Sequence, residues 1–342
     1  MRFDFSVFSV FADFPDMSEP GVPPSNKSAA SAATPAASTA AIPTATMASE
    51  ALWGEADHAR RFGGVARLYG VPALQAFEQA RVVVIGIGGV GSWVAEALAR
   101  SAVGRLTLVD LDNIAESNAN RQIHALDGNY GMAKVTAMAR RITLINPQCD
   151  VTEVEDFVEA DNFDRVLGGG FDFVVDAIDS VRTKTALLAW CVAHRQPVIT
   201  VGGAGGQLDP TRIRIDDLAQ TIQDPLLAKV RAGLRKQHGF ARGPKTKFKI
   251  PAVYSDEPLI YPELAEREMS TASPGGDAGA AADAETNLPS GPIGLNCAGF
   301  GSSVCVTASF GFAAAAYVLR ALAVRANAGA DAAANAASNA GA

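Results

Sequence analysis

The segment that decides the fold of this chain is Arg81-Val82-Val83-Val84-Ile85-Gly86-Ile87-Gly88-Gly89-Val90-Gly91. After Arg81 the run is apolar and β-branched, which predicts a buried parallel strand. The glycines at 86, 88 and 91 have the G-x-G-x-x-G spacing, which permits a tight turn and lets backbone N–H groups approach a phosphate. A helix predicted over 92–101 points its positive end at that turn. The segment therefore predicts a nucleotide-binding β-turn-α unit.

A second strand, Leu106-Thr107-Leu108-Val109-Asp110, ends in an acidic residue of the kind that hydrogen-bonds a ribose. Further strands are predicted over 151–154, 171–177 and 196–202, with helices over 131–146 and from 180 to about 195. This alternation predicts an α/β fold, with a Rossmann-like, doubly wound and mostly parallel sheet. Because ligands bind at the carboxyl ends of such strands, Asp110, Asp179 and Gly202 are expected to share one crevice.

Three segments lack the large apolar residues that a core needs. These are a head over 1–51, an insert over 264–290 and a tail over 326–342, all predicted to be disordered. What remains, 52–325, is expected to be one domain with a C-terminal helix. The four cysteines form no C-x-x-C pair, so neither a zinc ribbon nor a disulfide framework is indicated, and a reducing cytoplasm fits. The uncharged run 304–319 favours a core helix, with membrane association the weaker alternative.

Charged side chains near the predicted crevice argue against a dehydrogenase. Arg121 and Lys134 follow the second strand, and Asp179 follows a later one. Two cations and an additional carboxylate suit a triphosphate and Mg²⁺ better than a nicotinamide. A non-catalytic nucleotide-binding adaptor is disfavoured because these three residues occur together.

Several motifs together resemble the ubiquitin-activating-enzyme-like adenylyltransferases of the ThiF/MoeB type. They follow one another in the order expected for that family: 84–91, Leu108-Val109-Asp110-Leu111-Asp112, Asn118-x-x-Arg121-Gln122, Gly131-x-x-Lys134, Ile145-Asn146-Pro147 and Asp176-Ala177-Ile178-Asp179. Further stretches, at 61–70, 120–126, 176–182, 202–207 and 221–226, are similar to the branch of the family that dehydrates threonylcarbamoyladenosine in tRNA. The resemblance makes 52–325 an adenylation domain.

The resemblance implies a role for each matching residue. The nucleotide ATP would lie along Gly86, Gly88, Gly89 and Gly91, with Asp110 at the ribose and Asp112 also binding the nucleotide. Asn118, Arg121 and Lys134 would contact the phosphates, and Asp179 would hold Mg²⁺. Relatives carry an arginine finger in an R-Y-x-R pattern, whose second arginine is replaced here by Gly64. Arg61 and Arg67 are both candidates for that role, in the same chain or across a homodimer. A sulfur-transfer partner, a cysteine desulfurase or sulfur acceptor, is also implied.

The implied reaction activates the substrate carboxylate as an acyl-adenylate, which the carbamoyl group of the same nucleoside then captures with ring closure. Intramolecular capture needs no enzyme nucleophile. The alternative is adenylation of the C-terminus of a small ubiquitin-like sulfur-carrier protein.

A local excess of cations favours RNA over the sulfur carrier. The whole chain carries a net charge of -7, yet the part of the basic segment 225–262 that precedes Asp256 has no acidic residue. Its cations are Lys229, Arg231, Arg235, Lys236, Arg242, Lys245, Lys247 and Lys249. We predict that they contact tRNA phosphates, against the alternative of a solvated surface. Base stacking and core packing are both possible roles for the aromatic rings of Phe240, Phe248 and Tyr254.

Overall fold

The computed structural model describes residues 57–243, 245–261 and 300–340, and their side chains as far as 332. The head and the insert that we predicted to be disordered lie outside these residues. The compact unit begins at His58.

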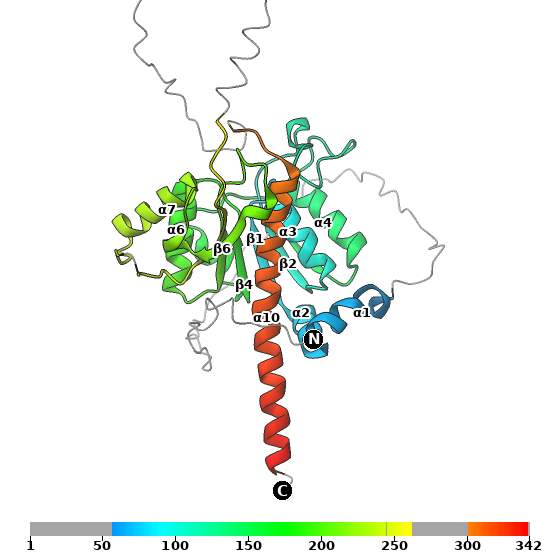
Figure 1. Cartoon of the computed structure of the whole chain (residues 1–342). Helices are drawn as coiled ribbons and strands as arrows, with labels where there is room; N and C mark the ends of the chain where they lie inside the picture. The colour runs from blue at the N-terminus through cyan, green and yellow to red at the C-terminus, as the bar shows by residue number, and fades with distance from the viewer. Residues whose placement is uncertain (1–56, 244, 262–299, 341–342) are drawn as a thin grey trace, which may run out of the picture. The chain divides into compact units, whose positions relative to one another are not determined.

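A seven-stranded sheet forms the centre of the unit, in the order β3-β2-β1-β4-β5-β7-β6 (Figure 1). The strands are β1 (Arg81–Ile85), β2 (Arg105–Val109), β3 (Asp150–Val154), β4 (Phe173–Asp176), β5 (Val198–Val201), β6 (Ile213–Asp217) and β7 (Pro251–Ser255). All neighbours pair in parallel except β6 and β7, which pair antiparallel. The predicted mostly parallel α/β fold is therefore confirmed, and the strand order reverses between β1 and β4.

The helices cover both faces of the sheet. They are α1 (His58–Tyr69), α2 (Val71–Gln79), α3 (Gly91–Arg100), α4 (Lys134–Ile145), α5 (Phe163–Leu167), α6 (Val181–Ala193), α7 (Pro225–Gln237) and α10 (Val304–Ala340), with short 3₁₀ turns η2 (Glu116–Asn118), η3 (Pro210–Arg212) and η4 (Leu218–Gln220). Val83 and Val174 pack in the core cluster that includes residues of α6 and α7. On the other face Phe173 meets Tyr317 of α10, with ring centroids 6.1 Å apart. Burial on both faces explains why β1 and β4 are continuous apolar runs.

Two ion pairs to the buried carboxylate of Glu96 fix α4 against α3. Glu96 is 3% exposed, and its carboxylate accepts from Arg100 at 2.7 Å and from Arg141 at 2.6 Å. Because Lys134 begins α4, these ion pairs also set the position of the lysine.

The tail differs from the sequence prediction. Helix α10 continues to Ala340, so the disorder predicted over 326–342 is wrong as far as residue 340. Alanine has the highest intrinsic helix propensity, and the long helix that precedes it removes the cost of nucleation. At the other end of the unit, α1 ends at Tyr69, before Gly70 with its φ of 97°.

One helix in the described part of the chain, over 304–332, is long and apolar enough to cross a membrane. However, 61% of its most apolar window is buried inside the protein. The helix packs against α2 and α3, and this burial favours the interpretation as a core helix, while its C-terminal part projects beyond the other elements (Figure 1).

Candidate active site

A cavity of about 450 Å³ opens at the carboxyl ends of the parallel strands. The predicted nucleotide and metal residues Gly86, Gly88, Gly89, Asp110, Asp112, Asn118, Arg121, Lys134 and Asp179 all line it. Gly202, Gly203 and Ala204 line it from the end of β5. The structure therefore confirms the expected convergence of Asp110, Asp179 and Gly202, and it brings the predicted phosphate residues to the same place.

The turn after β1 requires glycine at two positions. Gly86 has a φ of 87°, and a Cβ there would lie 2.8 Å from the carbonyl oxygen of Ala177. A Cβ on Gly91 would lie 1.8 Å from the carbonyl oxygen of Gly86, which is an impossible contact. Gly91 therefore closes the turn by allowing α3 to pack against it, although it does not itself line the cavity.

Asp110 is held by the backbone of that turn. Its Oδ2 accepts from the N–H of Ile87 at 2.6 Å and its Oδ1 from the N–H of Asp112 at 2.9 Å. Burial raises the pKa of Asp110, an effect that the charge of Lys134 partly offsets. The Lys134 ammonium lies 3.6 Å from Asp110 and 2.6 Å from Asp112, so it bridges the two carboxylates.

Arg121 and Asn118 are presented by the turn around η2. The Arg121 guanidinium donates to the Ser117 carbonyl and to Asn120 Oδ1, each at 2.9 Å, and its stem lies over Gly89. Asn118 accepts from the N–H of Ala115 at 3.0 Å. These contacts hold Arg121 over the glycine turn and Asn118 in the cavity wall.

Asp179 lies exposed at the cavity wall. Within the described residues its carboxylate has no hydrogen bond or ion pair, so it is open to a ligand. The same residues contain no group of three or more His, Cys, Asp or Glu side chains arranged to hold a metal. Asp179 therefore suits Mg²⁺ only if a bound molecule, such as a triphosphate, supplies further oxygens.

Below the cavity lies a buried polar cluster that the sequence analysis missed. The ammonium of Lys184 donates to Asp176 Oδ2 at 2.8 Å and to Thr200 Oγ1 at 3.1 Å. Thr200 donates to the same carboxylate at 2.6 Å. The remaining oxygen of Asp176 accepts from the N–H of Ile178, so the cluster fixes the backbone that leads to Asp179. Asp176 ends a strand and Lys184 lies eight residues later in a helix. Neither the strand repeat nor the helix repeat relates the two positions, so no sequence pattern predicts their contact.

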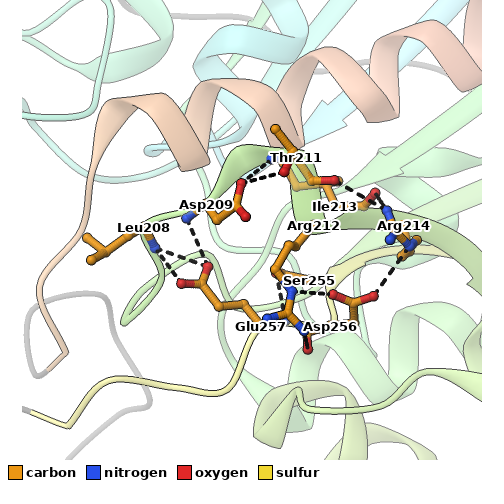
Figure 2. A network of polar contacts seen from close by, with 9 residues as sticks. All are labelled: Leu208, Asp209, Thr211, Arg212, Ile213, Arg214, Ser255, Asp256 and Glu257. Atoms are coloured by element: carbon orange, nitrogen blue, oxygen red, sulfur yellow. Dashed lines mark hydrogen bonds and ion pairs between the residues drawn. The ribbon is translucent and has the colours of Figure 1, made fainter.

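Two carboxylates hold the glycine-rich loop over 202–209. Asp224, the N-cap of α7, accepts from the N–H groups of Gly203 at 2.9 Å and Leu227 at 2.8 Å. Glu257 accepts from the N–H groups of Leu208 and Asp209, at 3.1 and 3.0 Å (Figure 2). Figure 2 also shows Asp256 between the guanidinium groups of Arg212 and Arg214. The loop that forms one wall of the cavity is thereby tied to β6 and β7.

The arginine-finger candidates lie elsewhere. Arg61, on α1, donates to the carbonyl oxygens of Leu144 and Ile145 at 3.2 and 2.7 Å, so it caps the C-terminal end of α4. Arg67 is exposed on the same helix. Neither residue lines the cavity of its own chain.

The basic segment presents its cations on α7 and the loop after it. Lys229, Lys236, Arg242, Lys245, Lys247 and Lys249 are exposed, whereas Arg231 and Arg235 are half-buried. Arg231 donates to Thr221, and Arg235 stacks over Phe248 at 5.2 Å. Phe248 and Tyr254 are each 5% exposed and belong to the core, with Phe240 packed against them, so these aromatic rings serve core packing.

Comparison with known proteins places the chain in a family. The ThiF family matches residues 61–332. The tRNA threonylcarbamoyladenosine dehydratase of Haemophilus influenzae is 47% identical over 264 residues, 77% of this chain and 93% of the relative. The Escherichia coli dehydratase is 50% identical over 262 residues, 76% of this chain and 92% of the relative. The crystal structure of E. coli TcdA in complex with ATP has a TM-score of 0.67 at 45% identity, covering 79% of this chain and 96% of the other. The chain belongs to the ThiF family and, within it, to the group of the tRNA threonylcarbamoyladenosine dehydratases.

Proposed function

We propose that this chain uses ATP to dehydrate threonylcarbamoyladenosine, next to the anticodon of tRNA, to its cyclic form. The observation that carries the proposal is the single cavity in which Asp110, Arg121, Lys134 and Asp179 meet. The E. coli relative has been solved in complex with ATP and with AMP, which supports a nucleotide in the same place.

The cavity suits the parts of ATP in order. Asp110, at the end of β2, would accept from the ribose hydroxyls. The glycine turn and the N-terminus of α3 present N–H groups to the phosphates. Arg121 and Lys134 would then neutralise the charge that builds up during transfer at the α-phosphorus. Lys134 now bridges Asp110 and Asp112, so binding of phosphate would redirect its ammonium.

The reaction follows from this arrangement. A carboxylate oxygen of the threonyl group attacks the α-phosphorus of ATP, and the bond to pyrophosphate breaks. The carbamoyl group of the same nucleoside then attacks the acyl carbon, loses a proton, and expels AMP. Proximity supplies the nucleophile, so no enzyme thiol is required. Burial raises the pKa of Cys149 to about 12 and also raises that of Cys191, which keeps both thiols protonated.

Mg²⁺ is part of the proposal: Asp179 would hold the ion, which would supply charge stabilisation to the phosphates. A homodimer in which Arg61 or Arg67 reaches the partner's cavity would explain why neither lines its own. A sulfur-transfer partner and a cytoplasmic location are further proposals that rest on the family.

The tRNA substrate is expected to lie against α7. Six cations of the basic segment are exposed on α7 and the loop after it, on a chain with a net charge of -7. Because phosphate contacts dominate RNA affinity, this local excess supports tRNA over a small ubiquitin-like protein.

The test is incubation of the purified chain with ATP, Mg²⁺ and tRNA that carries threonylcarbamoyladenosine, followed by mass analysis of the nucleosides. We expect the nucleoside to lose one water and AMP and pyrophosphate to form in equal amounts. A parallel reaction with a ubiquitin-like sulfur carrier tests the alternative. An unchanged nucleoside with active adenylation of the carrier would overturn the proposal.

A further inference from the structure

Two polar side chains line the cavity and have buried atoms without partners. Gln122 is 5% exposed and Thr307 is fully buried. Both residues belong to the cavity lining, and within the described part of the chain Gln122 Oε1 and Thr307 Oγ1 have no hydrogen-bond partner. A buried polar atom without a partner costs about 1–3 kcal/mol, and almost all such atoms in native proteins are paired. Two such atoms on residues that line one cavity point to a ligand that completes their bonding.

Packing of α10 places Thr307 beside the glycine turn. At Gly311, α10 approaches α3 so closely that a Cβ would lie 2.8 Å from the Val90 carbonyl oxygen and from Trp93 Cβ. Thr307 precedes Gly311 by one helical turn, about 6 Å along the axis. Asn120 joins the start of α10 to the loop of Gln122, because its amide donates to the Ser302 carbonyl at 3.1 Å. Gln122 and Thr307 therefore form a polar wall on the α10 side of the cavity, whereas Asp110 lies at the end of β2.

The chemistry of this wall differs from that of the phosphate residues. An amide offers both a donor and an acceptor, and a threonine hydroxyl does the same. A triphosphate has only acceptors, and Arg121 and Lys134 already face the cavity to serve them. A carbamoyl group next to a carboxylate carries both donors and acceptors, so it can satisfy an amide and a hydroxyl together.

We propose that Gln122 and Thr307 bind the threonylcarbamoyl group of the substrate nucleoside, an inference that rests on the proposed function. Gln122 accepts from a carbamoyl N–H and Thr307 donates to a carboxylate oxygen. The wall thereby orients the carboxylate toward the α-phosphate and the carbamoyl group toward the acyl carbon formed from it. Both residues are positioning groups, and neither exchanges a proton in the reaction.

The test compares Thr307→Val and Gln122→Met with wild type in three measurements. These are kcat/KM for tRNA carrying threonylcarbamoyladenosine, the dissociation constant for ATP, and the thermal unfolding midpoint. We expect kcat/KM to fall about tenfold or more for each variant, since a hydrogen bond to a charged or reacting group is lost. We expect ATP affinity to stay within about twofold of wild type, because the phosphates use other residues.

The unfolding midpoint separates a ligand-binding role from a structural one. Removing a hydroxyl that has no partner among the described residues is neutral or stabilising, so Thr307→Val is expected to unfold at the wild-type temperature or above. Thr307→Ser keeps the hydroxyl and is expected to retain most activity. Ser309→Ala removes a hydroxyl from the same helix, bonded to Cys305 O at 2.7 Å, and is expected to leave kcat/KM unchanged.

Three results would overturn the inference: unchanged kcat/KM in both variants, a tenfold loss of ATP affinity, or a fall of several degrees in the midpoint of Thr307→Val. If wild type itself leaves the nucleoside unchanged, the proposed function fails first. If wild type is active and both variants match it, the inference alone fails.

Discussion

The ammonium of Lys184 lies 2.8 Å from Asp176 Oδ2, and both side chains are completely shielded from solvent. A buried pair of this kind holds a structure in place because neither charge tolerates the loss of the other. We therefore expect Lys184→Met to lower the free energy of unfolding by about 3–5 kcal/mol, measured by urea denaturation. The double variant Asp176→Asn/Lys184→Met removes both charges and is expected to recover part of this loss. A single variant as stable as wild type would contradict the assignment.

His124 gives the stability a defined pH dependence. It is 1% exposed, its Nε2 lies 2.9 Å from the Ile87 carbonyl oxygen, and burial lowers its pKa from 6.5 to about 4. Between pH 6.5 and 4 the unfolded chain binds a proton at this position and the folded chain does not. The free energy of unfolding is therefore expected to fall by up to about 1.4 kcal/mol per pH unit as the pH drops through this window.

The measurement for His124 is urea denaturation of wild type and His124→Gln at pH 7, 6 and 5. The glutamine amide does not titrate, so the stability difference between the two proteins is expected to shift in favour of the variant at lower pH. A difference independent of pH would show that burial does not lower the pKa of His124 in the folded state.

Asp179 is expected to be essential for the chemistry. Asp179→Ala should abolish AMP release from ATP and substrate tRNA, because no other unpaired carboxylate within the described residues that line the cavity could replace it. The unfolding midpoint should stay within a few degrees of wild type, since the side chain is exposed. Asp161→Ala, an exposed aspartate outside the cavity, is the matched control. Full AMP release in Asp179→Ala would refute the metal assignment.

Lys229 and Lys236 on α7 test the tRNA surface. Substituting both by alanine is expected to weaken tRNA binding and to reduce the slope of log K against log salt by about 0.7–0.9 per lysine. ATP affinity should be unaffected. Arg140→Ala removes an exposed cation from α4 and serves as the control. Equal salt slopes in all three proteins would place the tRNA on another face.

Alanine substitutions of Arg61 and Arg67 are expected to have different effects on stability. Arg61→Ala removes two hydrogen bonds to the last carbonyls of α4 and should lower the free energy of unfolding by roughly 0.5–1.5 kcal/mol. Arg67→Ala removes an exposed side chain and should leave stability unchanged. If Arg67 is the finger, its loss lowers the rate of AMP release without changing the unfolding curve. Normal AMP release by Arg67→Ala would return the role to Arg61 or exclude both.

Local patterns in the sequence were enough to predict the nucleotide unit. Consecutive β-branched residues specify a covered strand, and sterics at Gly86 and Gly91 specify the turn, so both signals lie within a few neighbouring residues. Asp110 and Asp179 could be placed at one sheet edge because parallel strands end on the same side. The extent of α10 does not follow from the same patterns, because low apolar content predicts disorder, whereas the alanines of that tail continue an existing helix.

By itself the sequence determined the α/β class, the glycine turn and the side chains offered to a nucleotide, since each depends on periodicity or on steric limits between near neighbours. Only the tertiary structure decided that Thr307 lies beside the same cavity as Gln122, that Lys184 neutralises Asp176 below it, and that β7 pairs antiparallel with β6. Those contacts join residues far apart in the chain or across a change of element. They follow from how the helices pack on the sheet, which no pattern along the sequence specifies.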